Sequence, residues 1–359
     1  MDLLETLIIS SEKAANIARL LRQNEKLFEK LVEQKSTKEA NPRFQQDFKT
    51  LADVLIQEMV KHDVGLKFPS IREKVYGEES NMFFSKELNK YILVEVKESQ
   101  EATAALLAEL LDDDEEVAQM LATEVHRIID IKEVKTKIPQ GTIDIVIDDL
   151  SIWIDPIDGT NEYVKGTYET KTGDFYTKGL KCVTVLIGVY DKNGEPVMGV
   201  INQPFFEQED QGYQCHWGIC IQDKYRLSSI NVSDLKQTNI VCIGEGESAE
   251  IKTTLENGGF DLVVSRGAGY KLLTVVLGLA DAYILSKPST FFWDTCAPQA
   301  ILRALGGNIV EMNGIVTLQM KQCLTYNNDK GGSKCNSKGI IAYRNEAVLE
   351  KLMKFKWTN

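Results

Sequence analysis

Trp153-Ile154-Asp155-Pro156-Ile157-Asp158-Gly159-Thr160 is the most informative stretch of the chain, because it ends a β-branched and aromatic run with two carboxylates three positions apart. The run from Leu150 to Ile154 predicts a strand. Pro156 cannot donate a sheet hydrogen bond and Gly159 tolerates unusual backbone angles, so we expect the strand to break here. Asp155 and Asp158 would then lie on a rigid bend.

Oxygen atoms dominate this stretch. The two aspartates, the Ile157 carbonyl and the Thr160 hydroxyl form an oxygen-only donor set, which hard divalent cations such as Mg²⁺ prefer. The alternative is an ordinary Asx-turn in which each aspartate caps local amides. Acidic groups in three further segments favour the metal interpretation and suggest one assembled site: Asp53, the pair Glu78 and Glu79, and Asp294.

These motifs resemble those of the lithium-sensitive, magnesium-dependent phosphomonoesterase superfamily, which includes inositol monophosphatases, fructose-1,6-bisphosphatases and bisphosphate nucleotidases. The similar segments run through most of the chain, at residues 11–19, 47–53, 77–80, 182–190, 199–204, 267–271 and 339–344. The resemblance implies a layered α/β/α/β/α sandwich of the sugar-phosphatase type. It also implies an N-terminal α+β half, residues 1–195, with most metal ligands, and a C-terminal α/β half, residues 196–359, with Asp294 and the substrate-binding segment.

The resemblance also implies a role for each site residue. The first metal would be bound by Glu78, Asp155 and the Ile157 carbonyl, and the second by Asp155, Asp158 and Asp294. Glu79 would support a third, weaker metal, so two or three Mg²⁺ ions are expected, with Li⁺ as an inhibitor near Asp53 and Thr160. The catalytic residues would be Glu78 together with Asp53 and Thr160, which orient the nucleophilic water, and Asp53 is also counted among the metal-site residues.

Two segments are expected to bind substrate phosphates. Asp158, Gly159 and Thr160 lead into a helix whose free amides can accept phosphate oxygens. Gly267, Ala268 and Lys271 belong to a Gly-Ala-Gly-Tyr-Lys segment that suits a second phosphate, although a glycine-containing helix start with a surface lysine is the plainer alternative. The chain departs from the related sequences at Gly244–Ser248, where they tend to place serine and lysine.

The implied reaction is removal of the 1-phosphate from inositol 1,4-bisphosphate and inositol 1,3,4-trisphosphate by metal-activated water. A 3'(2'),5'-bisphosphate nucleotidase with the same metal chemistry is the nearest alternative. The Trp293-Asp294-Thr295-Cys296-Ala297-Pro298 segment fits that family at least as well. A catalytically silent metal-binding scaffold is a third possibility, because a fold does not guarantee a function.

Composition is consistent with a small-molecule enzyme. The chain has 359 residues and a net charge of -12, which disfavours nucleic-acid and anionic-membrane partners but allows phosphate binding once cations reverse the local field. Seven scattered cysteines predict reduced thiols, and structural zinc at Cys215, His216 and Cys220 lacks a second ligand pair. The first residues resemble a helix rather than a secretion signal, and no run of about twenty apolar residues predicts a membrane span. We expect a cytoplasmic monomer.

Periodicity predicts alternating helices and strands. Helices are expected at 2–32, 44–59, 101–111, 117–129, 269–279 and 296–305, and strands at 143–147, 182–190, 196–201, 240–243 and 282–285. Asn193-Gly194 predicts a hairpin between the strands at 182–190 and 196–201. Trp293 is expected to be a cleft-wall aromatic that fixes Asp294.

Overall fold

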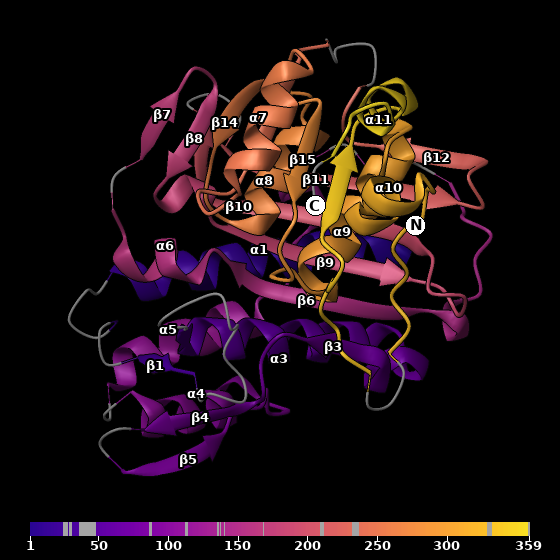
Figure 1. Ribbon diagram of the computed structural model, residues 1–359. Coiled ribbons are helices and arrows are strands. Elements are labelled where there is room, and N and C mark those ends of the chain that lie inside the picture. The colour runs from indigo at the N-terminus through magenta and orange to yellow at the C-terminus, as the bar shows by residue number, and fades with distance from the viewer. Residues whose placement is uncertain are drawn as a thin grey trace.

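Two sheets alternate with layers of helices in this chain (Figure 1). The computed structural model describes residues 1–23, 28, 31–35, 48–85, 88–111, 114–134, 136, 138–139, 141–167, 169–208, 212–231, 237–328 and 332–357. The larger sheet has six strands in the order β12-β11-β10-β9-β6-β3, and the smaller has five in the order β14-β13-β15-β17-β16.

Helices α1 (Asp2–Gln23) and α3 (Leu51–Lys67) cover one face of the six-stranded sheet, and their apolar side chains share a core with it, as Leu7, Leu55 and Ile187 show. The strands of this sheet are β3 (Val75–Gly77), β6 (Ser151–Asp158), β9 (Thr184–Tyr190), β10 (Pro196–Gln208), β11 (Gly212–Ile221) and β12 (Tyr225–Ser228). The hairpin predicted at Asn193-Gly194 is confirmed, because β9 and β10 pair antiparallel and Gly194 has a positive φ.

The second sheet joins β13 (Ile240–Ile243), β14 (Asp261–Val264), β15 (Ala282–Leu285), β16 (Asn308–Glu311) and β17 (Ile340–Tyr343). Helices α8 (Ala268–Val276) and α9 (Phe292–Leu305) lie between the two sheets, where Leu273 and Ile301 share a core with Leu186 of β9. Helices α7 (Ala249–Asn257), α10 (Met312–Leu318) and α11 (Glu346–Met353) complete the outer layer. The expected α/β/α/β/α sandwich is confirmed.

Smaller elements surround these layers. The helices are α4 (Gln100–Leu110), α5 (Glu115–His126) and α6 (Thr160–Lys165), and the 3₁₀ turns are η1 (Pro69–Lys74), η2 (Ile131–Glu133), η3 (Ile147–Asp149) and η4 (Leu180–Cys182). Three two-stranded ribbons pair β1 (Val32–Gln34) with β2 (Phe48–Thr50), β4 (Met82–Ser85) with β5 (Lys90–Leu93), and β7 (Thr170–Thr172) with β8 (Phe175–Lys178).

Two predicted helices and two predicted strands differ from the structure. The first helix ends at Gln23 rather than at residue 32, and Val32 belongs to β1. The second helix starts at Leu51, because Thr50 and Asp53 form a capping box that fixes its N-terminus. Residues 44–47 of that prediction lie outside the described residues. The strand predicted at 143–147 is absent from this described stretch, and its alternating isoleucines instead pack singly against the first core.

Strand β6 also differs from its prediction, because it continues through Pro156 to Asp158. The neighbouring β3 ends opposite Ile154, so no strand on that side needs an N–H from residue 156. On the other side the register with β9 shifts between Asp155 and Asp158, which is a bulge. The bulge places both aspartates at the end of the strand, and Gly159, with φ 83°, starts α6.

The division of the chain at residue 195 stays a prediction. The six-stranded sheet runs on to Ser228, and the five-stranded sheet begins at Ile240. We propose that two halves meet around the site described below, with the ligands on β6 in the first and Asp294 in the second.

Candidate active site

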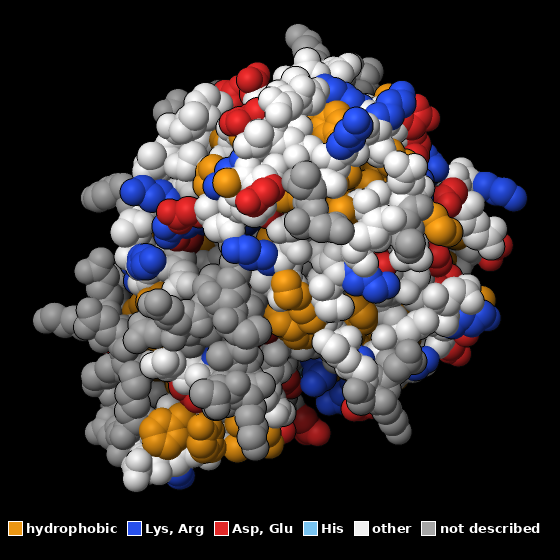
Figure 2. Space-filling view, viewed as in Figure 1, with side chains coloured by type: hydrophobic (Ala, Val, Ile, Leu, Met, Phe, Trp, Pro, Cys, Tyr) orange, Lys and Arg blue, Asp and Glu red, His pale blue; other side chains and the backbone are white. Residues whose placement is uncertain are grey.

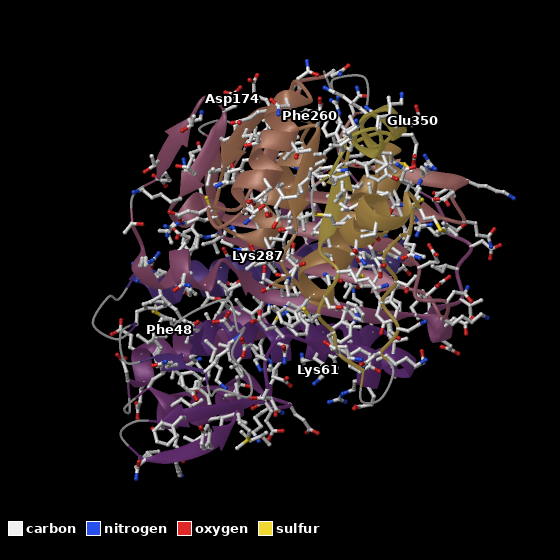
Figure 3. The ribbon with its side chains drawn as sticks, in the orientation of Figure 1. Phe48, Lys61, Asp174, Phe260, Lys287 and Glu350 are labelled. Carbon is white, nitrogen blue, oxygen red and sulfur yellow. The ribbon has the colours of Figure 1, made fainter. Side chains whose placement is uncertain are left out.

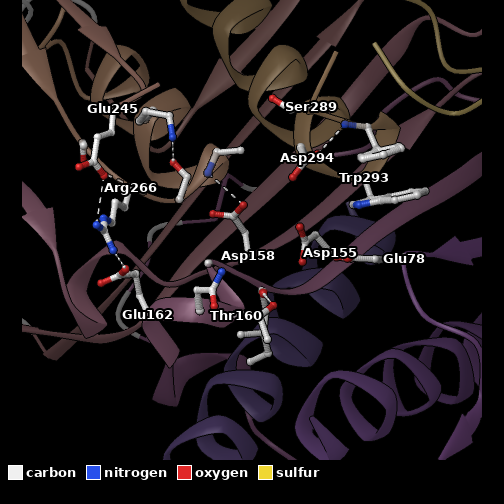
Figure 4. Close-up of a pocket in the computed structure, with 18 of the residues that line it drawn as sticks. Glu78, Asp155, Asp158, Thr160, Glu162, Glu245, Arg266, Ser289, Trp293 and Asp294 are labelled. Carbon is white, nitrogen blue, oxygen red and sulfur yellow. Dashed lines mark hydrogen bonds and ion pairs between the residues drawn. The ribbon is translucent and has the colours of Figure 1, made fainter. Parts of the chain in front are cut away.

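A cavity of about 380 Å³ lies at the end of β6, beside the first turns of α6, α8 and α9 (Figure 4). Most of the residues singled out from the sequence line it: Glu78, Asp155, Ile157, Asp158, Gly159, Thr160, Gly267, Ala268, Lys271 and Asp294. Asp53 and Glu79 do not line the cavity. The cavity therefore brings together acids from β6, from the turn after β3 and from α9.

Three buried aspartates converge in this cavity. Asp155, Asp158 and Asp294 each offer a carboxylate oxygen, and these oxygens lie within 4.8 Å of one another. The first two come from the bulged end of β6, and the third comes from the first turn of α9. Segments separated by more than 130 residues thus form one oxygen-rich cluster.

Neighbouring amides fix two of these carboxylates. Asp158 accepts hydrogen bonds from the backbone N–H groups of Ala268 at 3.1 Å and Gly269 at 2.9 Å. Asp294 accepts one from the N–H of Phe291 at 2.6 Å. Asp155 differs, because its buried Oδ1 has no hydrogen-bond partner. An unsatisfied buried carboxylate oxygen is costly, and a bound cation would satisfy it.

Burial and mutual repulsion raise the pKa values of the cluster. Burial raises the pKa of Asp155 and of Asp294 well above the ordinary aspartate value, and neighbouring carboxylates raise them further. Burial also raises the pKa of Asp158, to about 6, although Lys271 and the two amides oppose this rise. Several buried like charges require compensating cations. The donor set and its unsatisfied oxygen therefore fit hard divalent metal ions.

Glu78 and Glu79 lie next to this cluster and contact a buried lysine. The Lys35 ammonium pairs with Glu78 and lies 2.5 Å from Glu79 Oε1. Gln57 holds Glu79 through two hydrogen bonds to its backbone, of 2.7 and 3.0 Å. Burial and the charge of Glu78 raise the pKa of Glu79 well above its usual value. Lys35 could not be singled out from the sequence, because a single lysine in a polar segment carries no pattern.

Asp53 lies at the first turn of α3, where the N–H and hydroxyl of Thr50 each donate to its Oδ2 at 2.7 Å. Burial raises the pKa of Asp53 to about 7. Its charge contributes to the raised pKa of Asp155, so the two groups interact electrostatically. Thr160 donates its hydroxyl to the Ile157 carbonyl at 3.0 Å, and a carbonyl has a second lone pair for another partner.

The Gly267–Lys271 segment forms the start of α8, and it is more buried than a surface helix start. Lys271 is 4% exposed, so the alternative of a surface lysine is wrong. Its ammonium donates to the Gly267 carbonyl at 2.8 Å and lies 5.3 Å from the centre of the Tyr283 ring. The amides of Ala268 and Gly269 bind Asp158 rather than pointing at open solvent.

Arg266 is a second residue that the sequence analysis missed. Its guanidinium lines the cavity between Glu162 of α6 and Glu245, at 2.9 and 3.1 Å (Figure 4). Its place directly before the glycine-rich start of a predicted helix was the sequence feature that could have marked it as a site residue.

The remaining side chains shape the wall. Trp293 lines the cavity and stacks on Phe291 at 4.8 Å between ring centres, which confirms it as a cleft-wall aromatic. All seven cysteines are free thiols. Among the described residues, no cysteine and histidine cluster could bind zinc, and no helix is long and apolar enough to cross a membrane.

The sequence model of a protein family, described as the inositol monophosphatase family, matches residues 2–349. The chain belongs to the inositol monophosphatase family. Inositol polyphosphate 1-phosphatase of Mus musculus is 40% identical and covers 98% of this chain and 96% of its own length. Family membership and this nearly full-length relationship show that the protein is a phosphatase.

Two further similarities bear on the alternatives. The 3'(2'),5'-bisphosphate nucleotidase 1 of Mus musculus is 31% identical but covers only 54% of this chain and 58% of its own length. Among solved structures, the extragenic suppressor protein suhB of Bartonella henselae matches with a TM-score of 0.54 at 14% identity, covering 99% of this chain and 98% of that one. An IMPase/NADP phosphatase complexed with Mg²⁺ and phosphate has a TM-score of 0.51 at 14% identity, covering 93% and 90%. These two solved structures have the same fold as this chain.

Proposed function

We propose that this phosphatase removes the 1-phosphate from inositol 1,4-bisphosphate and inositol 1,3,4-trisphosphate, with water as the nucleophile and Mg²⁺ as the cofactor. The observation that carries the proposal is the convergence of Asp155, Asp158 and Asp294 within 4.8 Å in a cavity that cationic side chains also line. The nearly full-length similarity to an inositol polyphosphate 1-phosphatase supports the choice of substrate.

The proposed metal ligands are Glu78, Asp155, the Ile157 carbonyl, Asp158 and Asp294, with Glu79 near a third position. Bound Mg²⁺ would neutralise phosphoryl oxygens, lower the pKa of a coordinated water and stabilise the leaving alkoxide. The amides of Ala268 and Gly269 keep the Asp158 carboxylate aimed into the cavity. We infer two or three ions, because the carboxylates at this site exceed the charge that one divalent ion can neutralise.

Asp53 and Thr160 would orient the attacking water. Asp53 is held by Thr50 at the start of α3, and Thr160 is held by the bulged turn after β6. Burial raises the pKa of Asp53 to about 7 in the metal-free protein, and bound cations would lower it again and favour the carboxylate that accepts a hydrogen bond from water. Both side chains are short and are attached to ordered backbone. Less conformational entropy is therefore lost when they reach the reactive arrangement than long flexible side chains would lose.

Further parts of the proposal concern inhibition and cellular context. Li⁺ would compete at a metal position near Asp53 and Thr160, and the protein would act as a cytoplasmic monomer on small molecules. The net charge of -12 gives no support for nucleic-acid or membrane partners. A nucleotidase activity is less well supported, because that relative matches only about half of the chain.

The test is phosphate release from inositol 1,4-bisphosphate and adenosine 3',5'-bisphosphate, measured with Mg²⁺, with added Li⁺ and with chelator. The proposal predicts preferential release from the inositide that chelator abolishes and Li⁺ inhibits, with inositol 4-phosphate as the product. Preference for the nucleotide would reassign the substrate pocket, and no release from either compound would favour the silent scaffold.

A further inference from the structure

Arg266 forms a cationic flank of the cavity, away from the aspartate cluster. Figure 4 shows Asp158 between Arg266 and Asp155. The guanidinium donates through Nη1 to Glu162 and through Nη2 to Glu245, at 2.9 and 3.1 Å. It is 40% exposed and lines the cavity, so a bound molecule can reach it.

The two carboxylates that contact Arg266 differ in how firmly they are held. Glu162 is 3% exposed and also accepts a hydrogen bond of 2.7 Å from the N–H of Gly179. Glu245 is 74% exposed, and among the described residues its carboxylate contacts Arg266 alone. An exposed ion pair contributes little free energy. Glu162 is therefore a fixed support for the guanidinium, whereas Glu245 is an exchangeable partner.

The turn at Gly244–Ser248 explains why Glu245 faces Arg266. Glu247 is buried and accepts hydrogen bonds from the N–H and the hydroxyl of Ser286, which tie the turn to the end of β15. Ser248 caps α7 by accepting from the N–H of Ile251 at 3.2 Å. The Glu247 and Ser248 side chains, two and three positions after Glu245, thus hold the turn in place, and the Glu245 side chain pairs with the guanidinium.

A second cation adjoins this turn. A Cβ at Gly246 would lie 3.5 Å from the Lys287 ammonium, an ordinary contact distance, so this lysine lies directly beside the turn. Lys287 is labelled in Figure 3 at the position where the space-filling view of the same face shows a basic side chain (Figure 2). Basic groups around the turn thus oppose the acidity of the site. The turn at Gly244–Ser248 itself contains no lysine or arginine, so its cationic neighbours come from adjacent segments.

We propose that Arg266 binds the substrate phosphate that is not hydrolysed, and that Glu245 occupies its guanidinium until that phosphate displaces it. This inference rests on the proposed function. The 1- and 4-phosphates of inositol 1,4-bisphosphate leave opposite sides of the ring, so one can reach the metal-binding aspartates while the other reaches a separate cationic flank. With Nη1 held by Glu162, the Nη2 group that contacts Glu245 is the one available to a phosphate, which carries more charge than the carboxylate it replaces.

Arg266 is then a specificity-determining residue, and Glu245 is a built-in competitor. A bisphosphate gains the Arg266 contact and overcomes the competition from Glu245. A monophosphate lacks the second phosphate, so the ion pair between Arg266 and Glu245 stays intact when it binds. The pair should therefore alter the preference for bisphosphate over monophosphate rather than the chemical step at the aspartates.

The test compares KM and kcat for inositol 1,4-bisphosphate and inositol 1-phosphate in wild-type protein and in two variants. Arg266→Lys should raise the KM ratio of bisphosphate to monophosphate about tenfold, because a lysine cannot donate to Glu162 and to the phosphate in the same geometry, although the charge stays. Glu245→Gln should lower that ratio about two- to fivefold, because the competitor is removed. Glu250→Gln is the matched control, since it makes the same charge change at an exposed position on α7.

Glu245→Gln leaves the Arg266–Glu162 pair intact, so it tests the inference even if the arginine variant disturbs α6. Equal changes for the two substrates in both variants would overturn the inference while leaving the proposed function in place. A response of Glu250→Gln equal to that of Glu245→Gln would also overturn it, by reducing the effect to net charge. No release by the wild-type protein from either compound would overturn the proposed function itself.

Discussion

The carboxylate of Asp158 accepts a hydrogen bond of 2.9 Å from the backbone N–H of Gly269, and this contact joins the end of β6 to the first turn of α8. A proposed metal ligand from the six-stranded sheet is thus aimed by a helix that lies between the two sheets. Because the bond is buried, a shift of either element would move the ligand.

Gly269→Ala should disrupt this contact. A Cβ at Gly269 would lie 2.3 Å from Thr184 Oγ1 and 3.1 Å from Asp158 Oδ2, so the helix or the carboxylate must move. We expect a loss of about 1–3 kcal/mol in the free energy of unfolding. We also expect weaker Mg²⁺ binding, so that a higher Mg²⁺ concentration is needed for half-maximal activity. Urea unfolding and Mg²⁺ titration of activity measure the two effects.

Gly173→Ala is the control for that variant. Gly173 has φ 57° and no atom within 4 Å of the added Cβ, so it carries backbone strain without a steric contact. We expect a cost of about 1–2 kcal/mol and an unchanged Mg²⁺ titration. A shifted Mg²⁺ titration in the control, or an unshifted one in Gly269→Ala, would contradict the role given to the Asp158 contact.

Asp155→Asn should separate activity from stability. Without this carboxylate the proposed bridging ligand is lost, so phosphate release should fall by about 10³-fold or more. In chelator the variant should unfold at a higher temperature than the wild type, because one member of a repelling buried cluster becomes neutral. Asp174→Asn, an exposed change of the same charge, should alter neither property. Wild-type activity in Asp155→Asn would exclude this aspartate from the metal site.

Metal-free protein should gain stability as pH falls from 8 to 6. The pKa values of Asp53 and Asp158 are raised to about 7 and about 6, so the folded state binds protons that the unfolded state does not yet bind in this window. Stability from such groups is present at low pH and is lost as pH rises through the folded pKa. At the proposed metal site, Mg²⁺ would replace these protons.

The measurement is the melting temperature at pH 6 and pH 8, with Mg²⁺ and with chelator. Mg²⁺ should raise the melting temperature more at pH 8 than at pH 6, by at least about 2 °C. A stabilisation by Mg²⁺ that does not change with pH would show that the cation and the protons do not share these carboxylates.

Thr50→Ala should affect both folding and turnover. The hydroxyl of Thr50 caps α3 and donates to Asp53, so its loss removes an N-cap and a contact to a proposed catalytic carboxylate. We expect a cost of about 1–2 kcal/mol in unfolding free energy, together with a lower kcat. Thr50→Ser keeps the hydroxyl and should restore most of both. If serine and alanine behaved alike, the hydroxyl would have no part in holding Asp53.

The layered fold could be predicted from the alternation of helices and strands together with the family resemblance, and the joint ligand set of the aspartates from that resemblance. The Asn193-Gly194 hairpin and the motif around Asp155 follow from turn chemistry and strand composition. The path of β6 through Pro156 could not be predicted, since it depends on where β3 ends in space. The strand expected at 143–147 failed for a related reason, because alternation without a neighbouring strand does not make a sheet.

The contacts of single charged residues could not be predicted from the sequence either. Lys35 and Arg266 lie at the site only because the tertiary fold brings distant carboxylates to them: Glu78 and Glu79 for the first, and Glu162 and Glu245 for the second. Ion pairs between residues far apart in sequence leave no periodic pattern. The family resemblance supplied the aspartates, but it did not supply these two cations.

The central claim is that Asp155, Asp158 and Asp294 bind the divalent ions that drive phosphate hydrolysis. Crystals of the protein grown with Mn²⁺, which substitutes for Mg²⁺ at oxygen sites, would test it through anomalous scattering. The account predicts peaks within about 2.5 Å of these carboxylate oxygens, including Oδ1 of Asp155. Anomalous peaks elsewhere, with an active enzyme and no ion at this cluster, would contradict it.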